Sequence, residues 1–395
     1  MKAVVIIINF LSTVTFTCKI TLDGTSIICD DNGVDLDQLE IDDGKYNPLL
    51  SNSILARSGP RKTDKRRKNF VKNVGALKEM KHLTSFLAEE SGLADLPDKM
   101  FKFNDQLMHL VFSHNQISNI PEDLLPENAT SITEIRFDHN NLQKIPSKFF
   151  DVGKTPNLEV IHLEFNFLVR LPELFLKSLP NLKELYLHDN LLVSLGRSYD
   201  FVKKSNIGLY GLPFSGVQFA SKMRAIYLHN NYLPTTSFNK NIFGKSKELK
   251  ILNVANNRLA WLDEETFSGL NSLSHLYLEG NFFREIEPNL FNSTKNLQYL
   301  YLGSNLLKRL PFGLFAENPK LVKLGLDDNF IVPDGLKGIF LREKPVEMMG
   351  GGFFRSGPNL MENRPLDVKY EINPERIKLP QIDLRYNSDL DFVKQ

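Results

Sequence analysis

The sequence predicts an α/β repeat protein: a curved solenoid with a parallel β-sheet on its concave face and irregular or 3-10 helical segments on its convex side. Three observations predict this fold. One eleven-residue frame, L-x-x-L-x-L-x-x-N-x-L, returns along most of the chain. Its copies follow one another at about 24 residues, and most are followed by a phenylalanine about ten residues after the asparagine. A fixed period of this length is the signature of stacked structural repeats.

Eleven copies of the frame can be aligned, and nine of them match the whole frame. The first copy has Ser91 in place of the asparagine, and the last, around Asn387, loses its final leucine. The steps between successive anchors are 24 to 26 residues, apart from one of 41 and one of 58. The asparagines of the nine full copies are Asn115, Asn140, Asn166, Asn190, Asn231, Asn257, Asn281, Asn305 and Asn329.

The two long steps mark interruptions of the repeat. The first, near 191–222, contains SNIGLYGLPF, which is either a degraded repeat, the interpretation we favour, or an inserted loop. The second, near 333–376, contains MMGGGFFRSGP and has the turn chemistry of a long loop.

The repeated frame, with the Leu-Pro and Phe that follow it, resembles the extracellular typical-type leucine-rich repeat family, nearest to small leucine-rich repeat proteoglycans. The segment NLLKRLPFGLFAENPKLVKL repeats NLQKIPSKFFDVGKTPNLEVI almost position for position. The resemblance covers about residues 83–340 and again 379–389. It implies a curved leucine-rich repeat solenoid over 83–395 and association with the extracellular matrix.

The frame has a physical reading. Side chains alternate along a strand, so the leucines should point inward while the residues between them face the concave surface. The asparagine leaves the strand for a loop whose buried backbone needs partners, which a side-chain amide can supply. Asn190, flanked by His188 and Asp189, is therefore expected to be structural. A second inner spine is expected from Phe101, Phe150, Phe175, Phe243, Phe267, Phe291, Phe315 and Phe340.

The N-terminal region predicts secretion. Residues 1–17 combine a basic residue, a short apolar run and small residues before Cys18, which is typical of a signal peptide. No later apolar stretch is long enough to span a bilayer, so we expect no membrane span and a secreted, extracellular protein. In CKITLDGTSIIC the Asp23-Gly24 turn pairs Cys18 with Cys29 across a hairpin, residues 18–29, and a disulfide is expected there.

Residues 30–82 are expected to be a charged linker, first acidic and then basic. The net charge of +1 argues against a nucleic-acid binder. The basic run binds a sulfated glycan or acidic partner, is a processing site, or is a solvated linker; the sequence leaves all three open. The glycan-binding candidates are Arg61, Lys62, Lys65, Arg66, Arg67 and Lys68.

A tyrosine and histidine patch rimmed by carboxylates is expected on the concave face of the middle repeats. Tyrosine combines a large apolar area with a polar tip, which suits protein recognition. His162, His188 and His229, with Glu164 and Asp138 close by, are compatible with zinc, but such strands without metal are commoner, so we expect none. The expected ligand-binding residues are His162, Tyr186, His188, Tyr227, His229, Tyr277, Glu279 and Tyr301.

No catalytic motif stands out, so no catalytic residue, cofactor or enzyme activity is expected. Asn128 and Asn292 begin glycosylation sequons on convex-side loops. We therefore expect a secreted, non-catalytic protein that binds an extracellular or matrix protein on its concave sheet. The alternative is a glycan-tethered or pattern-sensing protein that acts through residues 61–68.

Overall fold

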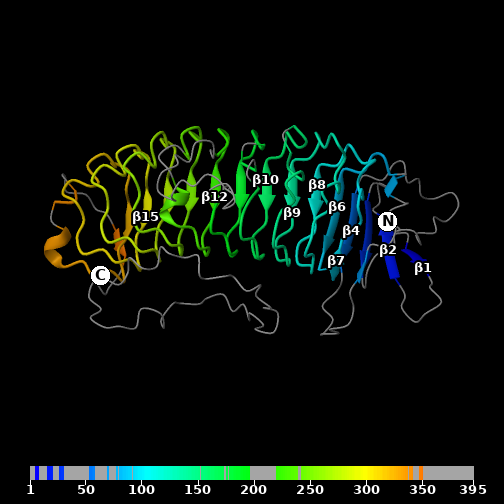
Figure 1. Ribbon diagram of the computed structural model, residues 1–395, viewed down its shortest axis with the longest axis horizontal. Helices are drawn as coiled ribbons and strands as arrows, with labels where there is room; N and C mark the ends of the chain where they lie inside the picture. Colours follow the sequence, from blue (N-terminus) through cyan, green and yellow to red (C-terminus); the bar gives the residue numbers. More distant parts are fainter. Residues whose placement is uncertain are drawn as a thin grey trace, which may run out of the picture. The chain divides into compact units, whose positions relative to one another are not determined.

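The computed structural model describes residues 77–78, 80–90, 92–151, 153–172, 175–176, 178–195, 219–238, 242–336 and 338–340, together with the backbone of six further strands. The repeats form a leucine-rich repeat solenoid, as the sequence predicts. Its short strands lie side by side in one sheet of 15 strands (Figure 1). From β3 onward every neighbouring pair in this sheet is parallel.

Ten of the eleven frames form strands of this sheet, and the frame around Asn387 lies outside the described residues. Each strand is short because the frame supplies only three or so extended residues before the turn at its asparagine. The strands are β6 (Ser85–Glu89), β8 (His109–Val111), β9 (Glu134–Arg136), β10 (Val160–His162), β11 (Glu184–Tyr186), β12 (Ala225–Tyr227), β13 (Ile251–Asn253), β14 (His275–Tyr277), β15 (Tyr299–Tyr301) and β16 (Lys323–Gly325).

The N-terminal hairpin is confirmed in its predicted register. Strand β2 (Phe16–Ile20) pairs antiparallel with β3 (Ser26–Asp30), and Cys18 lies opposite Cys29. The disulfide itself stays a prediction, since these side chains are outside the described set. Strand β1 (Val5–Ile8) pairs with β2 and lies within the predicted signal peptide, so cleavage after residue 17 would remove it together with the start of β2.

Part of the predicted linker is sheet. Strand β4 (Ser53–Arg57) lies between β3 and β6 and is parallel to both. Strand β5 (Asn69–Phe70) pairs with β7 (Leu93–Asp95) in a separate two-stranded sheet. The sequence prediction missed β4 because it lies between two charged segments, which indicated a linker. Its sequence SILAR nevertheless resembles SFLAE of β6, with which it pairs in register. The basic run 61–68 lies outside the described residues.

The two interruptions behave differently. Strand β11 is hydrogen-bonded directly to β12, so no repeat strand lies between them, and the favoured degraded repeat is wrong. The inserted segment itself, 196–218, lies outside the described residues. The second interruption contains strand β17 (Glu347–Met349), in which Met348 lies opposite Leu324. The 24-residue step therefore continues for one more strand than the frame predicts.

The core is one continuous column of leucine, isoleucine and phenylalanine inside the coil. In the nine three-residue frame strands, β8 to β16, the central residue is buried, while its two neighbours in most of these strands remain partly exposed. The predicted phenylalanine spine is confirmed: Phe267 and Phe291 stack at 6.3 Å between ring centroids, and Phe291 and Phe315 at 5.8 Å. Phe219, which we did not predict, continues it at 5.3 Å from Phe243.

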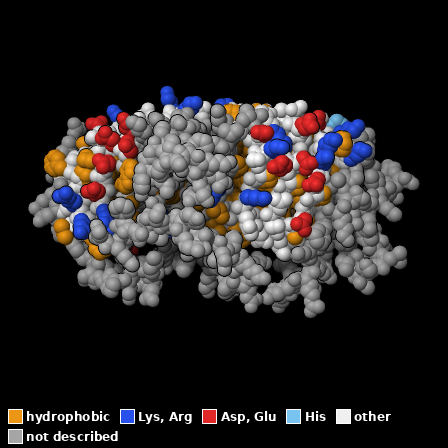
Figure 2. All heavy atoms as spheres, in the orientation of Figure 1, with side chains coloured by type: hydrophobic (Ala, Val, Ile, Leu, Met, Phe, Trp, Pro, Cys, Tyr) orange, Lys and Arg blue, Asp and Glu red, His pale blue; other side chains and the backbone are white. Residues whose placement is uncertain are grey.

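Away from the sheet, the coil has little regular structure, as predicted. It includes the short 3-10 helices η3 (Thr235–Ser237) and η4 (Pro333–Leu336). Among the residues described, no helix is both long and apolar enough to cross a membrane. Figure 2 shows acidic and basic side chains interspersed over the described part of the face in view, with no field of a single sign.

Candidate functional site

The asparagine of each frame holds the turn that ends the strand. Asn140 Nδ2 donates to the carbonyl oxygens of Phe112, at 2.8 Å, and of Phe137 and Asp138, and its Oδ1 accepts from the amide of Ile117. Asn190, two repeats after Asn140, makes the same set of bonds. Its Nδ2 donates to the carbonyl oxygens of Leu163, at 2.9 Å, and of Leu187 and His188, and its Oδ1 accepts from the amide of Leu168. Asn190 is therefore a structural residue of a buried ladder, not a reactive group.

The residue just before each ladder position adopts a left-handed backbone. His114, His139 and Phe165 have φ angles of 57°, 52° and 54°. This conformation turns the chain out of the strand and places three rings in one line: His114 and His139 stack at 4.0 Å, and His139 and Phe165 at 4.2 Å. The frame marks this position only as a variable residue, so the sequence did not indicate the ring line.

The residue between the second and third leucines of each frame, such as Tyr186 between Leu185 and Leu187, belongs to the first row of the concave face, which we call the tyrosine row. Its middle members are partly exposed and stack across neighbouring strands: His162 on Tyr186 at 4.1 Å, and Tyr186 on Tyr227 at 4.8 Å. Tyr186 also donates a hydrogen bond from its hydroxyl to Glu184 Oε2 at 2.8 Å. The sequence prediction that these three side chains lie together is confirmed by these contacts.

The tyrosine row is divided in two. Tyr277 and Tyr301 stack on each other at 4.9 Å, but the register puts Asn253 between Tyr227 and Tyr277. The concave face therefore carries two tyrosine stacks instead of one continuous stripe. From β9 to β16 the row is Arg136, His162, Tyr186, Tyr227, Asn253, Tyr277, Tyr301 and Gly325.

The next row, two residues further along each strand, is more buried than the sequence indicated, and we call it the inner row. Its members run from buried Asp138 and Glu164 to His188 and His229, whose rings stack at 4.3 Å. The phenylalanine and histidine rings of the left-handed positions pack beside it, as Phe165 does against His188 at 5.4 Å. The row is Ser113, Asp138, Glu164, His188, His229, Ala255, Glu279, Gly303 and Asp327.

Burial sets the protonation of the inner row. Loss of solvent lowers the pKa of His188 to about 3, with the nearby His229 as a second cause, and lowers the pKa of His229 to about 4. Burial also raises the pKa of Glu279 to about 7. Because the charged form of a buried group is disfavoured, both histidines are neutral at physiological pH. The inner row in this part of the sheet therefore offers neutral nitrogens, not positive charge.

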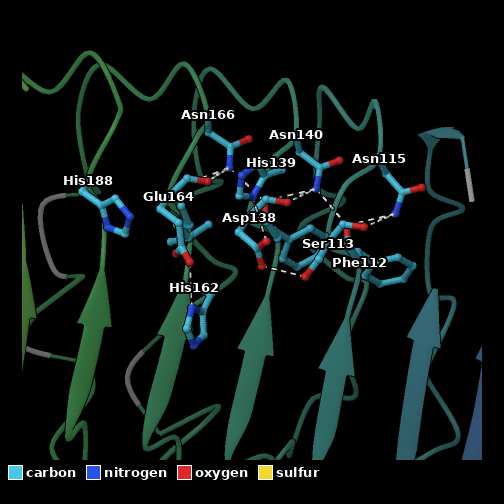
Figure 3. A network of polar contacts seen from close by, with 12 residues as sticks. Phe112, Ser113, Asn115, Asp138, His139, Asn140, His162, Glu164, Asn166 and His188 are labelled. Atoms are coloured by element: carbon cyan, nitrogen blue, oxygen red, sulfur yellow. Dashed lines mark hydrogen bonds and ion pairs between the residues drawn. The ribbon is translucent and has the colours of Figure 1, made fainter. Parts of the chain in front are cut away.

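A polar network joins β8, β9 and β10 at the inner row (Figure 3). Ser113 donates from Oγ to Asp138 Oδ1 at 2.6 Å, and Asp138 Oδ2 lies 3.1 Å from His139 Nδ1. His162 Nδ1 lies 2.9 Å from Glu164 Oε1. Serine, aspartate and histidine occur here in an order unsuited to nucleophilic catalysis, because the serine hydroxyl is bonded to the carboxylate and not to the imidazole.

Three groups of side chains have the composition of metal ligands, and in each group one atom per residue lies within 4.8 Å of the others. They are His114 with Asp138 and His139, His188 with Asp189 and His229, and Asp138 with His162 and Glu164. The sequence brought His162, His188 and His229 together as a single candidate. The sheet instead places His162 with the two carboxylates and the other two histidines in a separate pair.

A second charged group on the same face was missed. Glu134 binds the guanidinium of Arg136 and lies 3.2 Å from His109 Nδ1, and these partners lower the pKa of Glu134 against the effect of its burial. His275 and Tyr299 likewise stack at 4.5 Å on the first position of β14 and β15. Apart from Arg136, which belongs to the tyrosine row, these residues occupy the variable position before the central leucine or isoleucine of the frame, where the sequence gives no fixed residue type to search for.

The remaining predicted sites are placed only in part. Asn128 is exposed, and Asn292 is half-buried with its Nδ2 bonded to Asn289 Oδ1 at 3.0 Å. Both lie on loops away from the strands, as expected of glycosylation acceptors, and their modification stays a prediction. Figure 1 shows these loops as the turns that connect successive strands.

Comparisons with known proteins agree with this architecture. Residues 221–283 and 276–331 match the family described as leucine rich repeat, and residues 73–194 match the BspA type leucine rich repeat region. Podocan of Mus musculus is 29% identical over 199 residues, covering 43% of this chain and 31% of podocan. Nephrocan of Mus musculus is 28% identical, covering 39% and 30%, and fibromodulin of Bos taurus is 26% identical, covering 46% and 59%. The chain thus spans about a third of podocan and nephrocan and less than two thirds of fibromodulin.

Solved structures share the fold. The TLR13–ssRNA13 complex aligns with a TM-score of 0.55 at 22% identity, covering 75% of this chain and 38% of that one. The PEPR1–AtPEP1 structure aligns with a TM-score of 0.56 at 20% identity, covering 77% and 38%. At these identities the likeness establishes the solenoid alone. From its repeated frame, its parallel sheet and these matches, the chain belongs to the leucine-rich repeat family, and its curated relatives are small leucine-rich proteoglycans.

Proposed function

We propose that this protein is an extracellular, non-catalytic recognition protein that holds a protein ligand on the concave sheet of its middle repeats. The observation that carries the proposal is the stack of His162, Tyr186 and Tyr227, whose partly exposed rings form one apolar surface with polar tips. Stacked rings are already ordered, so they lose little conformational entropy when a partner covers them. The proposed contact residues are His162, Tyr186, His188, Tyr227, His229, Tyr277, Glu279 and Tyr301.

The extracellular assignment rests on separate support. The relatives are matrix proteoglycans, the first 17 residues have the composition of a signal peptide, and two sequons lie on surface loops. Intact mass of secreted material tests it: we expect a chain that begins at Cys18 and gains the mass of two alkyl groups only after reduction. A chain that keeps residues 1–17, or has two free thiols, would contradict the secretion proposal without touching the concave face.

The binding proposal is tested by recovering a partner and then disabling the stack. Affinity capture from extracellular fluid, read by mass spectrometry, identifies the partner. Burial of a tyrosine at an interface centre is worth about 2 kcal/mol, so Tyr186→Ala with Tyr227→Ala should weaken binding at least about tenfold. The matched control is Tyr232→Ala, because Tyr232 is an exposed tyrosine on the turn after β12 that stacks with Arg258 at 4.7 Å. Equal loss in the control would contradict the proposal.

The basic run supplies the competing explanation. If residues 61–68 bind a sulfated glycan by charge alone, replacing Arg66 and Arg67 by alanine should abolish capture at low salt, and raising the salt should do the same to the native chain. Aromatic burial is far less sensitive to salt. Normal binding by the tyrosine variant together with loss in the arginine variant would move the function to the basic run.

A further inference from the structure

Two carboxylates and one imidazole lie close together at the carboxyl ends of strands β9 and β10. Asp138 and Glu164 are equivalent residues of the inner row, and His162 precedes Glu164 by two positions in the tyrosine row. One ligand atom from each of the three residues lies within 4.8 Å of the other two. Figure 3 shows the side chains gathered between β9 and β10, below the asparagine ladder.

The two carboxylates differ in how well they are compensated: both oxygens of Asp138 are bonded, to Ser113 and His139, whereas only one oxygen of Glu164 has a partner. Asp138 is 7% exposed and Glu164 is 9% exposed, and Glu164 Oε2 is buried without a hydrogen-bond partner. Two buried carboxylates this close are unfavourable unless a cation or a proton sits between them. Arg136 acts on both through its charge, but its guanidinium is bound to Glu134. The unpartnered oxygen therefore leaves a place for a positive ion.

The neighbouring groups fit an ion less well. The rings of His188 and His229 are parallel to within 11° at 4.3 Å, and those of His114 and His139 to within 20° at 4.0 Å. An imidazole nitrogen donates its lone pair in the plane of its ring, so two rings stacked face to face cannot both point at one ion. His162 has no such conflict, because it stacks on Tyr186, which is not a competing ligand.

We propose that Asp138, His162 and Glu164 bind one zinc ion, with water as a fourth ligand. One nitrogen and two carboxylate oxygens are a donor set that zinc accepts, and the imidazole disfavours calcium and magnesium. Zinc would replace the proton that His162 Nδ1 and Glu164 Oε1 now share at 2.9 Å, and that proton would leave to solvent. Zinc ligand atoms at about 2.1 Å from the metal lie roughly 3.4 Å apart, so the two side chains need to separate only slightly. Ser113 and His139 hold the Asp138 carboxylate in place.

The site does not depend on the protein ligand proposed above, so it can be tested with metal alone. Full-length protein without a histidine tag is stripped with a chelator and titrated calorimetrically with zinc. We expect one ion per chain, cobalt substitution with visible absorption of a four-coordinate site, and little competition from calcium. No saturable binding at about 0.1 mM zinc would overturn the proposal, as would calcium binding more tightly than zinc.

Matched variants locate the ion. Glu164→Gln and Asp138→Asn keep the shape of the side chains and should weaken zinc at least about tenfold. Glu279→Gln is the control. Glu279 Oε2 is another unpartnered oxygen of the inner row, but the residue two positions before it is Tyr277, which corresponds to His162 and offers no imidazole. His188→Asn tests the adjacent pair. Equal losses in Glu279→Gln, or a loss in His188→Asn alone, would overturn the assignment; if Glu164→Gln does not fold, His162→Gln gives the same readout.

Discussion

The middle repeats, β9 to β12, and the C-terminal repeats, β13 to β16, are built on the same frame but present different surfaces. Both have the buried asparagine ladder, with Asn190 Nδ2 at 2.9 Å from Leu163 O and Asn305 Nδ2 at 3.1 Å from Leu278 O. In the inner row, however, Asp138, Glu164, His188 and His229 are replaced by Ala255, Glu279, Gly303 and Asp327. The frame determines the coil, and its variable positions determine what the coil can bind.

The largest expected effect tests the shared part of this comparison. Leu185 on β11 and Leu276 on β14 are both fully buried and occupy the same frame position. Replacing either one by alanine removes buried apolar area and leaves a cavity, so each should cost about 2–5 kcal/mol. Urea unfolding followed by circular dichroism measures both. A cost below about 1 kcal/mol for one of them would show that the two regions are not held by equivalent cores.

The second effect belongs to the C-terminal repeats. Burial raises the pKa of Glu279 to about 7, above its unfolded value of about 4.5, so the folded state holds a proton that the unfolded state has released between these pH values. Stability is therefore lost as pH rises from 4.5 to 7. Glu279→Gln should be more stable relative to the native chain at pH 8 than at pH 4, by about 3 kcal/mol. Exposed Glu264→Gln is the control, and a pH-independent difference for Glu279→Gln would contradict the burial argument.

The third effect belongs to the middle repeats and has the opposite sign. The pKa of His188 is lowered to about 3 by burial and by His229, so between pH 6.5 and 3 only the unfolded state takes up the proton. Stability is therefore lost as pH falls through this range. His188→Asn should reduce the loss between pH 7 and 5 by about 1–2 kcal/mol. Thermal unfolding at both pH values measures it, and an unchanged acid slope would mean that His188 is solvated in the folded state.

The sequence predicted the frame-built parts well because they repeat. A leucine or asparagine that returns at one step identifies a buried position without further information, and ten frames became strands in the expected register. Strand β4 and strand β17 were missed because Ile54 and Met348, which lie opposite Phe86 and Leu324 in the register, belong to segments that lack the rest of the frame. For the same reason the pairing of β11 with β12, which excludes a degraded repeat, could not be predicted.

The candidate site was predicted only in outline. The alternation of strand residues placed Tyr186, Tyr227 and His162 on one surface, and their stacking confirms this. The burial of Asp138 and Glu164 was not predictable from alternation, which treats both rows as solvent-facing. It depends on His139 and Phe165, the left-handed residues before Asn140 and Asn166, whose rings pack beside the inner row. The residue at this position varies from repeat to repeat.

Side-chain footprinting tests the central claim most directly. Hydroxyl radicals label exposed tyrosine and histidine side chains, and mass spectrometry reads the labelling of each residue with and without the captured partner. We predict strong protection of His162, Tyr186 and Tyr227, weaker protection of the Tyr277 and Tyr301 stack, and none at Tyr232. Unchanged labelling of Tyr186 and Tyr227 in a saturated complex would contradict the claim that the middle repeats hold the ligand.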